Sequence, residues 1–232
     1  MTGQNGTDGA ASAGDARLAT DRHTAPGMDM AADYAALSPA ARAVLDFWFG
    51  EPGAPAFGRA SERWFKRDDA YDALIRERFG RTLEGARRGE CDGWLGTPLG
   101  ALALVIVLDQ FSRNAYRGSA DAFAADAPAL EAARRLVASG AHLVLPTAEH
   151  RAFAYLPFEH AESLEAQRES VRLFEMLARE TGQTGKGSYV DYARRHAAVI
   201  KRFGRFPHRN AALGRVSTEE ECGFLREPGS SF

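Results

Sequence analysis

The chain has 232 residues, of which 45% are hydrophobic and 26% are charged, a composition typical of one globular domain large enough to bury a core. The formal net charge of −2 argues against a dedicated nucleic-acid-binding protein, because such proteins usually carry a basic excess. Cys91 and Cys222 are far apart in the sequence, so neither a disulfide framework nor a thiolate metal site is expected, and we predict a cytoplasmic protein.

The N-terminal segment differs from the rest of the chain. Residues 1–33 are rich in Gly, Ala, Asp, Ser and Thr and lack the apolar core of a signal peptide, so we predict a disordered tail. Residues 34–232 are predicted to form a single all-helical domain. Its strongest apolar run, "LGALALVIVL" at Leu99–Leu108, is about half the length that spans a bilayer. We therefore expect a buried helix there and no membrane segment.

Helix signals recur along the chain after Ser38. Ser38-Pro39 and Thr97-Pro98 each place a capping side chain before a proline at the first helical position, and no stretch alternates like a strand. The predicted class is all-α, with eight to nine helices in a bundle or a layered array of helical hairpins. The expected helices are Pro39–Phe49, Ala60–Phe65, Asp69–Arg88, Pro98–Asn114, Ala122–Ser139, Thr147–Tyr155, Pro157–Glu180, Ser188–Phe203 and Ser217–Arg226.

The helix expected over Pro98–Asn114 changes character in its last turn. It is apolar on all faces for two turns and then becomes polar, with Gln110 and Asn114 among the polar residues. Asp109 and Arg113 are four residues apart, so their side chains share a face and can form an ion pair. Such groups at the end of a buried helix must be satisfied internally or face a pocket. Both interpretations, a structural ion pair and a pocket, stay open.

A second polar position is predicted in the helix expected over Pro157–Glu180. His160 and Gln167 fall on the face marked by apolar residues at helical spacing, so both are expected to point toward the core. His160 would lie in the first helical turn, where free N–H groups and the helix dipole attract anions. Glu162 lies on a neighbouring face. A hydrogen-bonded core histidine is the alternative.

Two loops share an order of residue types. "QFSRNAYRGSADAF" (Gln110–Phe123) and "RFPHRNAALGRVSTEE" (Arg205–Glu220) both run from phenylalanine through Arg-Asn to an Arg/Gly pair and a helix start. The same turn geometry in both loops explains this order, because Asn114 and Asn210 tolerate the left-handed turn conformation. If the loops meet, they would form a cationic cluster that needs carboxylates or an anionic ligand. Its members would be Arg113, Arg117, Arg205, His208 and Arg209.

Several catalytic and cofactor motifs are missing from the sequence. "TGQTGKGS" (Thr181–Ser188) departs from a phosphate-binding loop, because it lacks the first glycine and follows a predicted helix instead of a strand. No helical histidine pattern for a metal and no G-x-S-x-G nucleophile motif is present. We therefore predict no metal and no cofactor, and leave catalytic residues unassigned.

These motifs together resemble a family of bacterial proteins of unknown function called DUF924. The resemblance covers about Ser38–Leu225 and rests on "VLDFWFG", "LDQFSRNAYRG", "FAYLPFEHAE" and "RFGRFPHRNAALGRVSTEE". It implies a tetratricopeptide-repeat-like fold of stacked helical hairpins, which often serves as a binding scaffold. Ala161 departs from the serine of the family pattern, which puts any hydroxyl role there in doubt.

Three functions fit the sequence. The first is binding of a small anionic molecule or a peptide carboxylate. The second is an enzyme of the hydrolase or transferase type that uses His160 with Asp109 or Glu162 as general base. The third is a protein-interaction scaffold in which the polar cluster is structural. No nucleic-acid or membrane partner is expected, and the oligomeric state is left open. The candidate site residues are Asp109, Gln110, Arg113, Asn114, Arg117, His160, Glu162, Gln167, Arg205, His208, Arg209 and Asn210.

Overall fold

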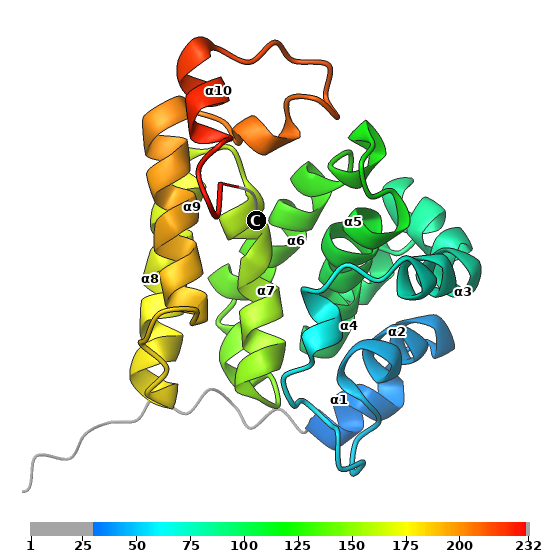
Figure 1. Cartoon of the computed structure of the whole chain (residues 1–232). Coiled ribbons are helices and arrows are strands. Elements are labelled where there is room, and N and C mark those ends of the chain that lie inside the picture. The colour runs from blue at the N-terminus through cyan, green and yellow to red at the C-terminus, as the bar shows by residue number, and fades with distance from the viewer. Residues whose placement is uncertain (1–29, 231–232) are drawn as a thin grey trace, which may run out of the picture.

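The computed structural model describes residues 30–230, which contain helices and turns and no strand (Figure 1). The all-α prediction is therefore confirmed, whereas the tetratricopeptide-like description stays a prediction. The α-helices are α1 (Met30–Ala36), α2 (Pro39–Phe49), α3 (Asp69–Arg87), α4 (Pro98–Val105), α5 (Ser112–Ala115), α6 (Asp126–Ala138), α7 (Ala148–His160), α8 (Leu164–Thr181), α9 (Tyr189–Phe203) and α10 (Glu219–Phe224).

The centre of the fold is α4 and the π-helical segment Ile106–Phe111 that continues it. Every residue from Pro98 to Phe111 is buried, in agreement with the apolar run in the sequence. Thr97 caps the start of α4 by accepting a hydrogen bond from the Gly100 N–H at 3.2 Å. None of the helices in residues 30–230 is long and apolar enough to cross a membrane.

Helix α1 begins inside the segment that the sequence assigned to the tail. Residues 30–33 are helical, and Asp33 is buried with its carboxylate accepting the Leu99 N–H at 3.0 Å. This bond ties α1 to the first turn of α4, which explains why residues 30–33 are helical although their composition predicts a tail. The rest of the predicted tail, residues 1–29, lies outside the described residues.

The predicted helix Pro157–Glu180 is wrong in its boundaries. Helix α7 runs through Pro157 and ends at His160, because Ala161 adopts an extended backbone with φ −76° and ψ 134°. A new helix, α8, then starts after Ser163, whose hydroxyl accepts the Ala166 N–H at 3.4 Å. His160 therefore lies at a helix C-terminus, where the dipole is negative, and not at an N-terminus that would attract an anion.

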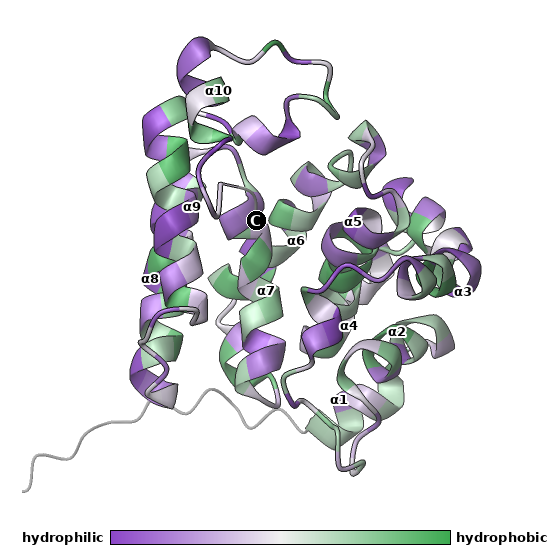
Figure 2. Cartoon of the chain, in the orientation of Figure 1, coloured by the Kyte–Doolittle hydropathy of each residue, from purple (hydrophilic) through white to green (hydrophobic). Residues whose placement is uncertain are grey.

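Helices α7, α8 and α9 lie side by side, each packed on the next (Figure 1). Hydrophobic and hydrophilic residues are mixed along these helices (Figure 2), and the buried positions of α8 and α9 are mostly apolar, among them Leu173, Phe174, Val190 and Ile200. Helix α9 ends at Gly204, which adopts the left-handed conformation at φ 71° that glycine reaches without steric cost. The following segment turns back over the end of the bundle toward α6.

Gln167 holds the break between α7 and α8 together. Its buried side-chain amide donates to the carbonyl oxygens of Glu159 at 2.6 Å and Ala161 at 2.9 Å, which the end of α7 leaves without helical partners. The predicted core orientation of Gln167 is thus observed, and its contacts are with backbone.

We predict that Gln167→Leu lowers the free energy of unfolding by about 2–3 kcal/mol, because it leaves buried carbonyls without donors. Urea denaturation measures this loss. The neighbouring exposed variant Arg168→Leu is the control and should change the stability by less than about 0.5 kcal/mol. Equal effects of the two variants would contradict the bridging role of Gln167.

Candidate functional site

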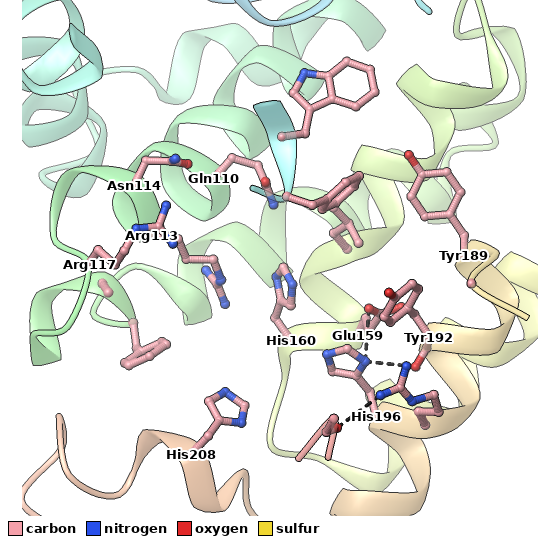
Figure 3. Close-up of a pocket in the computed structure, with 18 of the residues that line it drawn as sticks. Gln110, Arg113, Asn114, Arg117, Glu159, His160, Tyr189, Tyr192, His196 and His208 are labelled. Carbon is pink, nitrogen blue, oxygen red and sulfur yellow. Dashed lines mark hydrogen bonds and ion pairs between the residues drawn. The ribbon is translucent and has the colours of Figure 1, made fainter. Parts of the chain in front are cut away.

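A pocket of about 940 Å³ opens between the polar end of the central helix and the helices α7 and α9. Figure 3 shows His160 in its middle, with Arg113 and Arg117 on one side and Glu159, His196 and Tyr192 on the other. The volume lies within the range of small-molecule sites. Aromatic and aliphatic residues complete its walls, namely Trp64, Phe65, Phe123, Leu156 and Tyr189.

Asp109 lies behind the pocket wall and orients side chains that line it. Its carboxylate is almost fully buried and accepts hydrogen bonds from His160 Nδ1 at 2.7 Å and Gln110 Nε2 at 2.6 Å, while Arg113 Nη1 pairs with it at 2.9 Å. Burial alone would raise the pKa of this carboxyl, but Arg113 and His160 outweigh it and hold the pKa well below its usual range. The ion pair expected between Asp109 and Arg113 is present.

The π-helical segment supplies the local geometry for this wall. Ile106–Phe111 replaces α-helical turns just before α5, and the wider turns change the direction in which the following side chains point. The Asp109 carboxylate reaches His160 on α7 from this segment. Such π-helical segments are frequent at functional sites.

His160 presents its second ring nitrogen as a proton acceptor. Because the ionised Asp109 only accepts, Nδ1 carries the proton, and Nε2 has no hydrogen-bond partner among residues 30–230. Burial and the nearby Arg113 lower the pKa of His160, although Asp109 acts in the opposite direction. The imidazole is therefore neutral at pH 7, with Nε2 able to take up a proton.

Asp126 brings the two Arg-Asn loops together. Its carboxylate lies 2.9 Å from Arg113 Nη1 and 3.0 Å from Arg209 Nη1. Arg209 also donates to the His160 carbonyl at 2.8 Å, and its guanidinium lies 4.6 Å from the ring centres of both Phe123 and Phe206. Burial first, and then Arg113, lower the pKa of Arg209 to about 10, so it remains charged at pH 7.

The other predicted cations are only partly brought to this site. Arg117 lines the pocket edge with Asn114, and both bond the buried Asp72, at 2.7 Å from Arg117 Nε and from Asn114 Nδ2. Arg205 lies outside the pocket and bonds Glu221 at 2.6 Å. The single cationic cluster expected from the sequence is therefore divided among four carboxylate partners: Asp72, Asp109, Asp126 and Glu221.

Three further candidate residues lie away from the pocket lining, in contacts with the protein itself. Glu162 pairs with Arg215 at 2.7 Å and accepts the Phe206 N–H at 2.8 Å. Asn210 donates to Ser217 at 3.0 Å, and Gln167 caps α7 as described above. His208, by contrast, lines the pocket beside Arg209.

Glu159 and His196 line the pocket but were absent from the candidate residues, and so was Asp126, the carboxylate that pairs with Arg113 and Arg209. Glu159 lies next to His160, and His196 comes from α9, where Ala193 and Ile200 mark the same buried face. His196 Nδ1 lies 3.2 Å from Glu159 Oε1. The sequence indicates His196 through its place in the apolar stripe of α9. It indicates Asp126 as an acidic residue in the first turn of a helix.

The geometry thus defines an all-helical protein with a mixed-charge pocket built around an aspartate and a histidine. A family model for a bacterial protein of unknown function, DUF924, matches residues 44–229, and the chain belongs to this family. The solved structure of a protein of unknown function, ATU0120 from Agrobacterium tumefaciens, is 36% identical, with a TM-score of 0.68 over 85% of this chain and 99% of that chain. No curated protein matches.

No group of three His, Cys, Asp or Glu side chains within residues 30–230 is arranged to hold a metal ion. The pairs that line or support the pocket, such as His160 with Asp109, each combine one histidine with one carboxylate.

We predict that Asp126→Asn lowers the free energy of unfolding by about 2–3 kcal/mol, because Arg113 and Arg209 lose a carboxylate in a largely buried environment. Thermal or urea unfolding measures this effect. Asp121→Asn is the matched control, since that exposed carboxylate pairs with Arg87 at the surface and should contribute less than about 1 kcal/mol. A loss no larger than that of the control would contradict the bridging role of Asp126.

Proposed function

We propose that this protein is an enzyme that acts on a small polar molecule in the pocket, with His160 as general base. The supporting observation is the 2.7 Å contact between His160 Nδ1 and the buried Asp109, which leaves Nε2 without a partner within residues 30–230. An aspartate in this position fixes the tautomer of the ring and stabilises the imidazolium that forms on proton uptake.

The charge balance of the pocket favours this proposal over simple anion capture. Arg113 and Arg209 carry two positive charges, and Asp109 and Asp126 carry two negative charges within 3.0 Å of them. The arginines therefore have internal partners and do not require an anionic ligand for compensation. Their contribution to an enzyme would be to orient a polar group of the substrate near His160.

Binding of a small anion or peptide carboxylate without chemistry is the second candidate. It is supported by Arg209 Nε and Arg113 Nη2, which are buried donors without a hydrogen-bond partner among the described residues. A carboxylate that entered this side of the pocket could satisfy them. Under the scaffold hypothesis, the paired arginines and aspartates only stabilise the fold and bind no ligand.

Our enzymatic proposal predicts that His160→Gln lowers kcat/KM by about 10²–10⁴. The assay is a panel of chromogenic esters, amides, phosphate esters and glycosides with the full chain. His142→Gln, which changes a buried histidine outside the pocket, controls for general effects, and circular dichroism checks the fold. Unchanged turnover in His160→Gln excludes His160 as the base, and inactivity of the wild type over the panel favours the second candidate.

If the protein binds a small anion without chemistry, Arg209→Lys should weaken the binding of inorganic phosphate or of carboxylate metabolites by at least about tenfold. Lysine cannot reproduce the planar guanidinium group that stacks between Phe123 and Phe206. Calorimetry of both proteins measures this change. Arg202→Lys on the exposed end of α9 is the control. A lower melting temperature with no binding in either protein would support the scaffold hypothesis.

A further inference from the structure

Glu159 is a buried carboxyl group that lines the pocket and has no arginine or lysine bonded to it within residues 30–230. The residue is 4% exposed, and its Oε2 atom has no hydrogen-bond partner in the part of the chain that the structure describes. Within residues 30–230, its one polar side-chain contact is the 3.2 Å approach of His196 Nδ1 to Oε1. A buried polar group without a partner in the wall of a cavity needs an explanation, and a neutral carboxyl group provides one.

The surroundings of Glu159 disfavour a negative charge there. The titratable groups that face it are Asp109 from the π-helical segment, His160 on its own helix, and His196 and Tyr189 from α9. Asp109 is already ionised, and the histidines are neutral. An ionised Glu159 would therefore be a second buried carboxylate beside the first, without an arginine or lysine bonded to it.

His196 lies beside Glu159 without donating its ring hydrogen to it. Its Nδ1 lies 2.9 Å from the Tyr192 carbonyl oxygen, an acceptor, so Nδ1 carries the hydrogen atom. The same nitrogen lies 3.2 Å from Glu159 Oε1, but its hydrogen atom is directed at the Tyr192 carbonyl oxygen, and this approach is not a hydrogen bond. Figure 3 shows Glu159 beside His196 in the pocket wall, so its neighbour there is a neutral ring and not a cation.

We propose that Glu159 is a neutral carboxylic acid that donates its proton to the substrate, with His160 as the base of the same reaction. This inference rests on the enzymatic function proposed above. The substrate class it indicates is a molecule whose leaving oxygen needs protonation, such as a glycoside or an alkyl ester.

The proton balance of a hydrolysis closes with these two residues. Water transfers a proton to His160 Nε2 as its oxygen bonds to the substrate, and the bond to the leaving oxygen breaks as that oxygen takes the Glu159 proton. The step leaves an imidazolium at His160 and a carboxylate at Glu159. Transfer of one proton from His160 to Glu159 through water in the pocket then restores both groups.

The electrostatics of the site agree with this geometry. Burial, followed by the charge of Asp109, raises the pKa of Glu159 from 4.5 to about 8. Burial lowers the pKa of His196 to about 3, so the contact between them joins two neutral groups at pH 7. Because the pKa of Glu159 is higher in the folded than in the unfolded chain, stability is lost as the pH rises from about 4.5 to 8.

The protonation state is tested by infrared difference spectroscopy of the full-length wild type against Glu159→Gln across pH 5–10. We expect a protonated-carboxyl band at pH 7 that is absent from the variant and titrates near pH 8. The control is Glu221→Gln, because Glu221 is equally buried but bonded by Arg205, which lowers its pKa to about 2. A Glu159 that is ionised at pH 6 overturns the proposal, whatever the activity data show.

The donor role is tested with paired substrates that differ in their leaving group. Glu159→Gln should lower kcat by about 10²-fold or more for an alkyl ester or glycoside and much less for the nitrophenyl analogue, whose leaving group needs no proton. His160→Gln should affect both substrates alike. Equal losses for both substrates in Glu159→Gln overturn the donor role, whereas unchanged turnover in His160→Gln overturns the proposed base and leaves the infrared result standing.

Discussion

The buried carboxylate of Asp109 is the interaction on which the arrangement of the pocket depends. A charge at 1% exposure is tolerated only because Arg113, His160 and Gln110 all point at it. These contacts join the π-helical segment to the end of α7, and they fix the ring of His160. Stability and the orientation of the proposed base thus come from the same ion-pair network.

A second constraint is the break in the chain after His160. Helix α7 ends there and α8 starts at Leu164, so the backbone turns where Glu159 and His160 leave the helix. Gln167 satisfies the carbonyls of that turn, and Arg209 satisfies the carbonyl of His160. The neighbouring residues His160 and Glu159 therefore meet different environments. His160 lies beside Asp109, which is paired with an arginine, and Glu159 lies beside the neutral His196. Their pKa values are shifted in opposite directions, which is the arrangement that acid and base catalysis uses.

The arginine-rich loops divide between structural and pocket roles. Arg205 and Glu221 stabilise the segment before α10, and Arg117 with Asn114 holds Asp72. Only Arg113 and Arg209 converge, and they do so on Asp126. A cluster of positive residues in the sequence is therefore a poor measure of the charge in a folded pocket, because carboxylates from other helices compensate it.

The sequence by itself determined the helical class, the buried central helix, the pairing of Asp109 with Arg113 and the family resemblance. These follow from local patterns: apolar periodicity, caps, and residues four apart on one helix. The helix that contains His160 was misplaced, because a proline usually marks a helix start, and here α7 continues through Pro157. Only the tertiary structure decided the partners of the arginines, the joining of two loops by Asp126, and the isolation of Glu159. Each of these depends on which charged side chains the fold brings together from distant segments. Burial then decides whether a carboxyl group keeps its charge.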